Sequence, residues 1–293
     1  MVFQDPDQFV IQTSADRSAG RSAGRAAQKW FSDTENVKFF REFEAEYLRL
    51  PRKLCVEIAL DSLDASAGPS AVEERLLGWP RPPIDILDVG CGTGSNLLYL
   101  QERRPEAKII GIDPEPAMID LATETKSAEI IQATIENAPF EPESFDLIIS
   151  HSNFRLWNEP VEGLKKIYQL LKPGGLAYIL DLRGDVTPDL RQHLLERLDS
   201  EIKRQFFASQ LEAAYTPDQI KNFLEQAAIT HYTLGLGGLG GYPIRSSAAF
   251  ALLQKNEYIA ELVFRLSQEG FRSSRSADAT LHLYIRRPMT KGI

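Results

Sequence analysis

The stretch DILDVGCGTGSNLLYL, Asp85–Leu100, decides the fold class of this chain. An apolar run of strand character leads into three alternate glycines, Gly90, Gly92 and Gly94, and a run of helical periodicity follows. Because glycine lacks a Cβ, this spacing indicates that something approaches the backbone very closely. The fingerprint of dinucleotide-binding proteins needs its third glycine one residue later, where this chain has Ser95. The pattern therefore disfavours NAD and FAD.

Two acidic residues frame this turn. Asp88 stands two residues before the first glycine, and Asp113 ends the next strand, 19 residues after Gly94. An anion at Asp88 suits a ligand that carries a cationic amino acid better than it suits a phosphate. A carboxylate at the carboxyl edge of an open sheet can accept two hydrogen bonds from a ribose. Together the two positions imply an adenosine without phosphates.

The segment that begins at Ile84 alternates short β-rich runs with stretches of helical periodicity. Strands that are apolar on both faces, with helices between them, specify a parallel sheet covered on both sides. We therefore predict an α/β fold with an open sheet. The predicted strands are IDILDV (84–89), AKIIGID (107–113), EIIQ (129–132), FDLIIS (145–150) and LAYILDL (176–182).

Four motifs in this region carry a resemblance to a known family. They are LDVGCGTG, GIDPEPAMI, ENAPFEPESFDLI and LKPGG, in this order between Ile84 and Leu182. Here the chain resembles the class I S-adenosylmethionine-dependent methyltransferases, and in particular their type 11/25-like small-molecule subgroup. The resemblance implies a Rossmann-like, open, mostly parallel seven-stranded sheet with helices on both faces. It also implies S-adenosyl-L-methionine as cofactor and S-adenosyl-L-homocysteine as product.

The same resemblance implies a set of cofactor-binding residues. The three glycines would pass beneath the methionine and ribose, Asp113 would bind the ribose hydroxyls, and Asp88 would hold the amino-acid end through water. Met118 would pack near the adenine. The full predicted set is Asp88, Gly90, Cys91, Gly92, Gly94, Asp113, Pro114, Met118, Thr134, Ile135 and Ser150. No metal-ligand set is expected.

Two positions depart from the family pattern. Thr134 stands where relatives commonly place an acid that accepts the adenine amino group, and a neutral hydroxyl accepts that bond more weakly. Arg155 and Leu156 stand where relatives often show a pair of histidines. These departures keep a second hypothesis open, in which the protein binds S-adenosylmethionine without catalysis and serves as a partner or regulator.

Catalysis of methyl transfer mainly requires alignment of the nucleophile and exclusion of water. His151, at the carboxyl end of the fourth strand, is the candidate base, with a substrate or cofactor contact and a structural role as alternatives. The candidate substrate residues are Tyr47, Phe154, Trp157 and Arg183, each with a packing or ion-pair role as the alternative.

The remaining segments divide the chain into parts. We expect a flexible tail over residues 1–28, a helical lid over 29–80 interrupted at Pro51, and a methyltransferase domain over 81–293 with a cap at 185–215. A single helix is expected from Asp189 to Gln205, and a helix capped by Thr216 follows. In the C-terminal α/β extension, either AAFALLQ (248–254) or ATLHLYI (279–285) supplies the final antiparallel strand.

Composition limits the partners. The net charge of −8 and the pI near 5.2 argue against a nucleic-acid-binding surface, which needs clustered lysine and arginine. Two cysteines and no long apolar run predict a cytoplasmic protein without a membrane span. We therefore expect methyl transfer to an oxygen or nitrogen of a small molecule or short peptide, in secondary or specialised metabolism.

Overall fold

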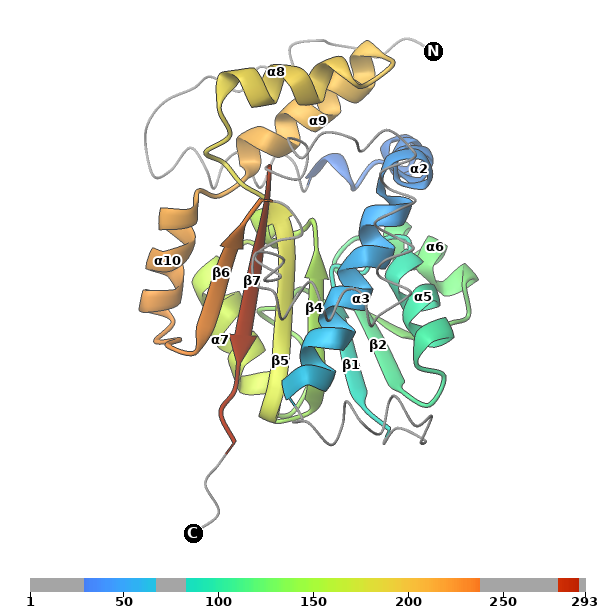
Figure 1. Ribbon diagram of the computed structural model, residues 1–293. Coiled ribbons are helices and arrows are strands. Elements are labelled where there is room, and N and C mark those ends of the chain that lie inside the picture. Colours follow the sequence, from blue (N-terminus) through green and yellow to red (C-terminus); the bar gives the residue numbers. More distant parts are fainter. Residues whose placement is uncertain (1–28, 67–82, 238–278, 290–293) are drawn as a thin grey trace.

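The computed structural model describes residues 29–66, 83–237 and 279–289, and its centre is a seven-stranded sheet with the order β3-β2-β1-β4-β5-β7-β6 (Figure 1). β1 to β5 are parallel to one another, whereas β7 runs antiparallel to both β5 and β6. This confirms the predicted α/β fold and mostly parallel sheet. The strands are β1 (Asp85–Val89), β2 (Lys108–Asp113), β3 (Glu129–Gln132), β4 (Phe145–His151), β5 (Leu171–Leu182), β6 (Tyr232–Leu236) and β7 (Thr280–Arg286).

The register of the central strands brings several chain segments to one edge. Val89 at the end of β1 pairs with Ile112 of β2 and with Ser150 of β4. The next residue along each strand, namely Gly90, Asp113 and His151, therefore comes to the same carboxyl edge. Ligands of open α/β sheets bind at this edge, next to the strand where the order reverses.

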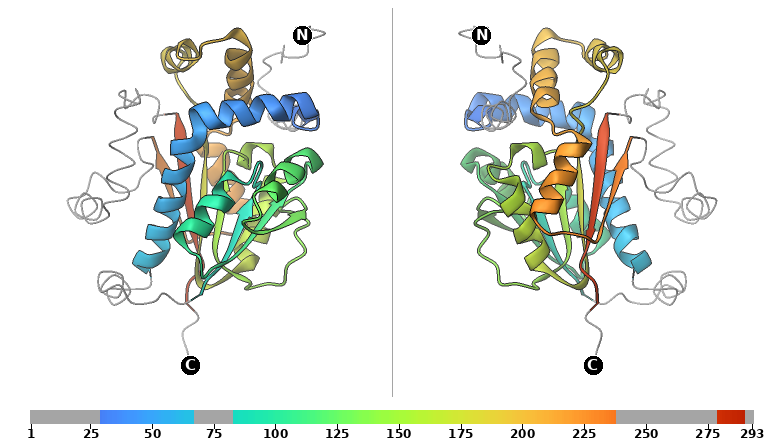
Figure 2. Two further views of the ribbon diagram at one scale, coloured as in Figure 1. Left: turned by 90° about the vertical axis from the view of Figure 1, so that its right-hand side faces the viewer. Right: turned by 90° about the vertical axis from the view of Figure 1, so that its left-hand side faces the viewer.

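Helices cover both faces of the sheet because strands such as β1 and β4 are apolar on both sides (Figure 2). On one face α3 (Arg49–Ser66) packs with α5 (Ser95–Arg103) in a core that also includes Ala122 of α6 (Pro116–Glu124). On the other face α7 (Pro160–Leu170) packs with α10 (Pro217–Gln226). The predicted capping of α10 is confirmed, because the Thr216 side chain accepts from Gln219 N in a capping box.

The N-terminal helical segment, which we predicted as a lid over 29–80, does two different things. α2 (Thr34–Phe43) lies across the carboxyl edge of the sheet, whereas α3 runs down one sheet face and contributes Cys55 and Val56 to the core (Figure 2). A π-helical turn, η2 (Glu44–Leu48), joins them. We expected the interruption at Pro51, and the structure places it one turn earlier. Pro51 has no N–H to donate to the carbonyl of Tyr47, so the regular hydrogen-bond pattern breaks at that turn.

Residues 185–215, which we predicted as a cap, contain two helices that lie above the sheet edge (Figure 1). The single helix predicted from Asp189 to Gln205 is wrong: α8 (Pro188–Glu196) ends and α9 (Glu201–Ala213) begins after Ser200. The Ser200 side chain accepts from Lys203 N and caps the new helix. Phe206 of α9 then packs against the rings of α2, so the cap and the N-terminal helix cover the edge together.

Of the two runs that could supply the final antiparallel strand, one lies within the described residues. ATLHLYI supplies β7, which pairs with β5 from Leu176↔Arg286 to Leu182↔Thr280. The other run, 248–254, and the predicted tail over 1–28 lie outside the described residues. Among the described helices, none is long and apolar enough to cross a membrane.

Candidate functional site

The glycine turn after β1 leaves an open space at its centre. The backbone N–H groups of Gly90 and Cys91 both donate to the carbonyl of Ile112, which ties the turn to β2. Gly92 has a φ of +56°, and a Cβ placed on it would meet nothing within 4 Å. A Cβ on Gly94, by contrast, would lie 3.0 Å from Cα of Ala122, so this glycine allows α5 and α6 to pack closely. Of these two glycines, Gly92 is therefore the one that faces an opening.

Asp113 stands beside this opening. Its Oδ2 accepts from Gly92 N at 2.9 Å and its Oδ1 accepts from Glu115 N at 3.0 Å, so the carboxylate also shapes the turn. Burial raises its pKa to about 6. A carboxylate has about four lone-pair sites, so two remain for a ligand in the cavity that Asp113 lines.

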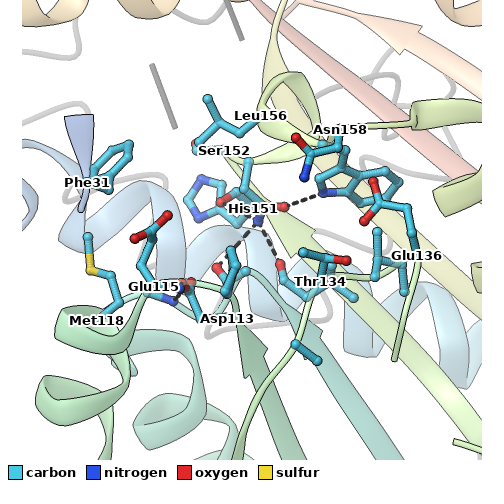
Figure 3. A pocket seen from close by; sticks show the side chains of 18 of the residues that line it. Phe31, Asp113, Glu115, Met118, Thr134, Glu136, His151, Ser152, Leu156 and Asn158 are labelled. Atoms are coloured by element: carbon cyan, nitrogen blue, oxygen red, sulfur yellow. Dashed lines mark hydrogen bonds between the residues drawn. The ribbon is translucent and has the colours of Figure 1, made fainter. Parts of the chain in front are cut away.

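The opening is part of a cavity of about 710 Å³, its mouth included (Figure 3). The loop side of the cavity consists of Gly90, Gly92, Asp113 and Thr134, and the cover side consists of Phe31, Phe40 and Leu156. Figure 3 places His151 between Leu156 and Asp113. The other lining residues are Arg52, Val89, Pro114, Glu115, Met118, Ala133, Ile135, Glu136, Ser152, Asn153, Trp157 and Asn158.

His151 ends β4 and is 5% exposed. Its Nδ1 has no hydrogen-bond partner within the described part of the chain. Burial, together with the positive charges of Arg52 and Arg155, holds the pKa of this imidazole well below its usual range. The ring is therefore neutral at physiological pH and presents a hydrogen-bond acceptor.

Asn153 fixes the loop that follows β4. Its Nδ2 donates to the carbonyl of Val89 at 2.6 Å, and its Oδ1 accepts from Ser150 Oγ and Trp157 Nε1 at 2.9 and 2.8 Å. A Cβ on Gly90 would lie 2.5 Å from Cγ of Asn153. The close approach of this side chain explains the glycine at position 90.

Residues 87–179 match the family model described as a methyltransferase domain. The demethylmenaquinone methyltransferase of Chlorobaculum tepidum is 30% identical over 60% of this chain and 73% of that protein. The chain belongs to the class I S-adenosylmethionine-dependent methyltransferases. The uncharacterized methyltransferase YdaC of Bacillus subtilis is 36% identical, but the match covers 36% of this chain and 60% of that protein.

A solved structure extends the likeness to most of this methyltransferase chain. The plantazolicin methyltransferase BamL, in complex with a triazolic desmethylPZN analog and SAH, superimposes with a TM-score of 0.76. The alignment covers 92% of this chain and 96% of that one at 23% identity. At this identity the likeness concerns the fold, which includes regions outside the family motifs.

The cavity brings together most of the predicted cofactor residues. Gly90, Gly92 and Asp113 line it, and Pro114, Met118, Thr134 and Ile135 line the part beyond Asp113. Thr134 Oγ1 donates to Asn137 Oδ1 at 3.2 Å, which leaves its lone pairs free to accept.

Four predicted cofactor residues do not line the cavity. The side chain of Cys91 packs into the core beneath the turn, Ser150 bonds to Asn153, and Gly94 allows close helix packing. Asp88 lies under the turn and is fully buried. Burial raises its pKa to about 7.

Three of the four candidate substrate residues also lie elsewhere. Phe154 packs against Trp157 and Tyr215, and Arg183 forms an ion pair with Asp185. These contacts match the packing and ion-pair roles that we gave as the alternatives for the two positions. Tyr47 lies under the amine of Lys203. Only Trp157 of this group lines the cavity.

Arg155, at the position of the expected histidine pair, makes a buried network. It pairs with Asp181 at the end of β5, and its Nε and Nη2 donate to Gln210 Oε1 of α9 at 3.2 and 2.7 Å. The guanidinium therefore ties the loop after β4 to the cap. Its neighbour Leu156 lines the cavity.

Sequence reasoning missed several lining residues, among which Arg52 is the most informative. Arg52 is 5% exposed and lies on the helical face that buries Cys55 and Val56, three and four residues later. A charged residue on the apolar face of a helix was the available signal. Other residues that line the cavity and were not predicted are Phe31, Phe40, Glu136, Ser152 and Asn153.

Proposed function

We propose that this protein transfers a methyl group from S-adenosylmethionine to an oxygen or nitrogen of a small molecule. The observation that carries the proposal is the open space over Gly92, directly beside the carboxylate of Asp113. A backbone that a ligand can touch, next to an acid with free lone pairs, suits a nucleoside without phosphates. Family membership makes S-adenosylmethionine the candidate nucleoside.

The lining residues suggest how the cofactor lies. Asp113 would hold the ribose hydroxyls, Pro114 and Met118 would pack against the adenine, and Thr134 and Glu136 could accept from its amino group. The amino-acid end then extends over Gly92 and Gly90 toward Asp88. His151 and the cover side would then lie at the reacting end of the cofactor.

The reaction is a displacement in line with the breaking bond. The acceptor atom forms a bond to the methyl carbon as the carbon–sulfur bond breaks, and the electron pair stays on the sulfur of S-adenosylhomocysteine. Because His151 is neutral, its Nδ1 can accept a hydrogen bond from the acceptor O–H or N–H and take up the proton that this group loses. The remaining task is alignment and exclusion of water, which the covering helices perform.

The cover side supports an apolar acceptor. Phe31, Phe40 and Leu156 offer ring and alkyl surface and no charge. One relative is named for demethylmenaquinone, and a structural neighbour was solved with a desmethylPZN analog, so we propose a neutral metabolite or short modified peptide from specialised metabolism. The free, buried thiols of Cys55 and Cys91 fit a reducing compartment, and we place the reaction in the cytoplasm.

Calorimetric titration tests the cofactor assignment. Wild-type protein, Asp113→Ala and Asp120→Ala would each be titrated with S-adenosylmethionine, S-adenosylhomocysteine and NAD. Asp120 is exposed on α6, so its variant has the same charge change away from the cavity. We expect wild type and Asp120→Ala to bind the first two ligands and Asp113→Ala to lose them. Binding of NAD alone would overturn the proposal.

A second candidate is a cofactor-binding partner protein without catalysis. It is favoured by Arg155, whose side chain is committed to Asp181 and Gln210 where relatives often have histidine. Mass spectrometry of acceptor mixtures incubated with protein and cofactor separates the two functions. A methylated product supports the enzyme, and tight cofactor binding without product from any quinone, phenol or azole peptide supports the partner.

A further inference from the structure

A second cavity lies on the sheet face where α3 runs beside α5 (Figure 1). This outer cavity has a volume of about 1070 Å³, its mouth included. One wall comes from α2, η2 and α3, and the other comes from the glycine turn, α5 and the end of α6. Among the described residues, Arg52 alone lines both this cavity and the cavity over Gly92. The rest of the outer cavity is therefore separate from the site proposed for the cofactor.

A row of residues spaced four apart forms the helical wall of the outer cavity. The row consists of Arg41, Ala45, Arg49 and Lys53. Four residues make slightly more than one α-helical turn, so residues at this spacing drift around the helix axis. The π-helical turn η2 lies in the middle of the row and, with more residues per turn, reverses the drift. Three cations thus share one side of the segment, with the small side chain of Ala45 between them.

Both acids that line the outer cavity already have an arginine as partner. Glu44 is buried, and its Oε1 lies 2.9 Å from Nη1 of Arg52. Glu124 is exposed on α6, and its Oε2 lies 3.7 Å from Nη1 of Arg41. These two pairs neutralise each other's charge within the cavity wall. The charge that remains is carried by the other two cations.

Those two cations, Arg49 and Lys53, form no ion pair with any residue that the structure describes. Arg49 is exposed at the start of α3. Lys53 is half-buried, and its Nζ lies 4.7 Å from the centre of the Tyr99 ring, which also lines the cavity. The outer cavity therefore holds two positive charges without acidic partners, in a chain whose net charge is −8.

We propose that the outer cavity binds a small organic phosphate monoester. Such a group carries about −1.5 to −2 charge at neutral pH, which matches the two unpaired cations, whereas one carboxylate would match only one of them. The guanidinium of Arg49 binds phosphate oxygens with paired N–H groups, and the ammonium of Lys53 binds them as a point charge. Leu98, which is 46% exposed, and Leu121 provide apolar surface for the organic part.

The alternative is that the cations only form a solvated helix face. Charges on such a face extend into water and gain little from any ligand. Two features oppose this alternative: the ammonium of Lys53 lies against a ring of the opposite wall, and Ala45 leaves the wall hollow between Arg41 and Arg49. The arrangement suits an anion that enters the cavity. This site goes beyond the proposed methyl transfer and does not depend on it.

Calorimetric titration with 1-naphthyl phosphate and with 1-naphthol tests the proposal. We expect the phosphate to bind wild-type protein with a Kd below about 1 mM, and the neutral naphthol to bind at least about tenfold more weakly. Arg49→Met and Lys53→Met should each weaken phosphate binding about tenfold, through loss of one charge-assisted contact. Lys38→Met is the matched control, because Lys38 is exposed on α2 and lines neither cavity.

A variant that keeps every charge separates the cavity from general electrostatic attraction. Ala45→Phe fills the hollow between the cations, and Ala45 is exposed, so the fold should tolerate the ring. This variant should lose binding of 1-naphthyl phosphate about tenfold or more and keep its wild-type melting temperature. Excess S-adenosylhomocysteine should leave the phosphate affinity of wild type unchanged within about twofold. Competition with S-adenosylhomocysteine, equal losses in Lys38→Met and Lys53→Met, or no binding to wild type would overturn the proposal.

Discussion

The loop side and the cover side of the cavity differ in how they can recognise a molecule. The loop side presents backbone groups and the Asp113 carboxylate, with Arg52 and Asp88 close by, so it selects by hydrogen bonds with fixed directions. The cover side presents Phe31, Phe40 and Leu156, so it selects by shape and by exclusion of water. One cavity can therefore bind a polar cofactor tightly and still accept an apolar partner.

The two sides are also built from different elements of the fold. The loop side grows from the ends of neighbouring parallel strands, whose register is fixed by the sheet. The cover side is assembled from the N-terminal helical segment and the loop after β4, which Arg155 ties to α9. Changes on the loop side should therefore affect cofactor affinity, and changes on the cover side should affect the acceptor.

The largest effect is expected from a methyl group at the centre of the turn. Gly92→Ala places a Cβ in the open space at a φ of +56°, so cofactor affinity should fall by about 100-fold or more. Gly94→Ala introduces a similar backbone strain, but its Cβ meets α6 and should lower the melting temperature instead. Titration and thermal melting of both variants check this contrast. Equal affinity losses in the two variants would contradict it.

Asp88→Asn should raise the stability of the folded protein and lower its affinity for the cofactor. The folded-state pKa of Asp88 is about 7, against an ordinary value of 3.8, so the folded protein binds the extra proton more tightly. The stability of the cofactor-free protein therefore falls as pH rises from about 4 to 7, and burial of the charge is fully unfavourable above pH 7. The variant should melt at a higher temperature than wild type at pH 8, with a smaller gain at pH 5.

The same variant should bind S-adenosylhomocysteine about 10- to 30-fold more weakly, because it loses the charged partner of the ammonium. Asn96, beside position 88, offers its unpaired Oδ1 to the new amide. Differential scanning calorimetry at the two pH values and titration measure the two effects. A lower melting temperature at pH 8 would show that the charge of Asp88 stabilises the fold.

His151 stands between the two sides, and its replacement should affect turnover more than binding. His151→Leu should lower the turnover rate about tenfold through loss of one hydrogen-bond acceptor. His151→Gln should restore part of it. Because the pKa is well below its usual range, the wild-type rate should fall only on the acid side of pH 6.5, and this fall should vanish in the leucine variant. A pH–rate profile that is the same in both proteins would exclude the role.

The smallest effect is expected on the cover side. Phe31→Leu removes ring surface from the acceptor space and should raise the KM of the acceptor about five- to tenfold, with cofactor affinity changed less than about twofold. Phe39→Leu is the control, because Phe39 belongs to the same aromatic cluster without lining the cavity. Steady-state kinetics with each substrate varied in turn measures this. A larger change for the cofactor than for the acceptor would contradict the division of the cavity.

The loop side was largely predictable because its residues follow each other closely in the sequence. Strand periodicity placed Asp113 and His151 at one edge, and the spacing of Gly90 and Gly92 indicated a close ligand approach. The sequence did not distinguish side chains that line the cavity from neighbours that pack beneath it. Cys91 and Ser150 are adjacent to lining residues but point into the core or toward Asn153.

The cover side was less predictable because tertiary packing, rather than local pattern, selects its residues. Tyr47 and Phe31 are both aromatic residues of the N-terminal segment, but only Phe31 reaches the cavity. The π-helical turn η2 changes which side chains of the N-terminal segment face the same direction before and after it. Helical periodicity alone does not reveal this change. The break between α8 and α9 was missed because apolar residues at helical spacing, Leu194, Leu198 and Ile202, continue across the capping residue Ser200.

A crystal structure with S-adenosylhomocysteine bound would test the proposed function most directly. We expect the ribose hydroxyls on Asp113 and the sulfur facing His151 and the cover side. A ligand whose sulfur faces the sheet core, or whose ribose lies away from Asp113, would contradict it.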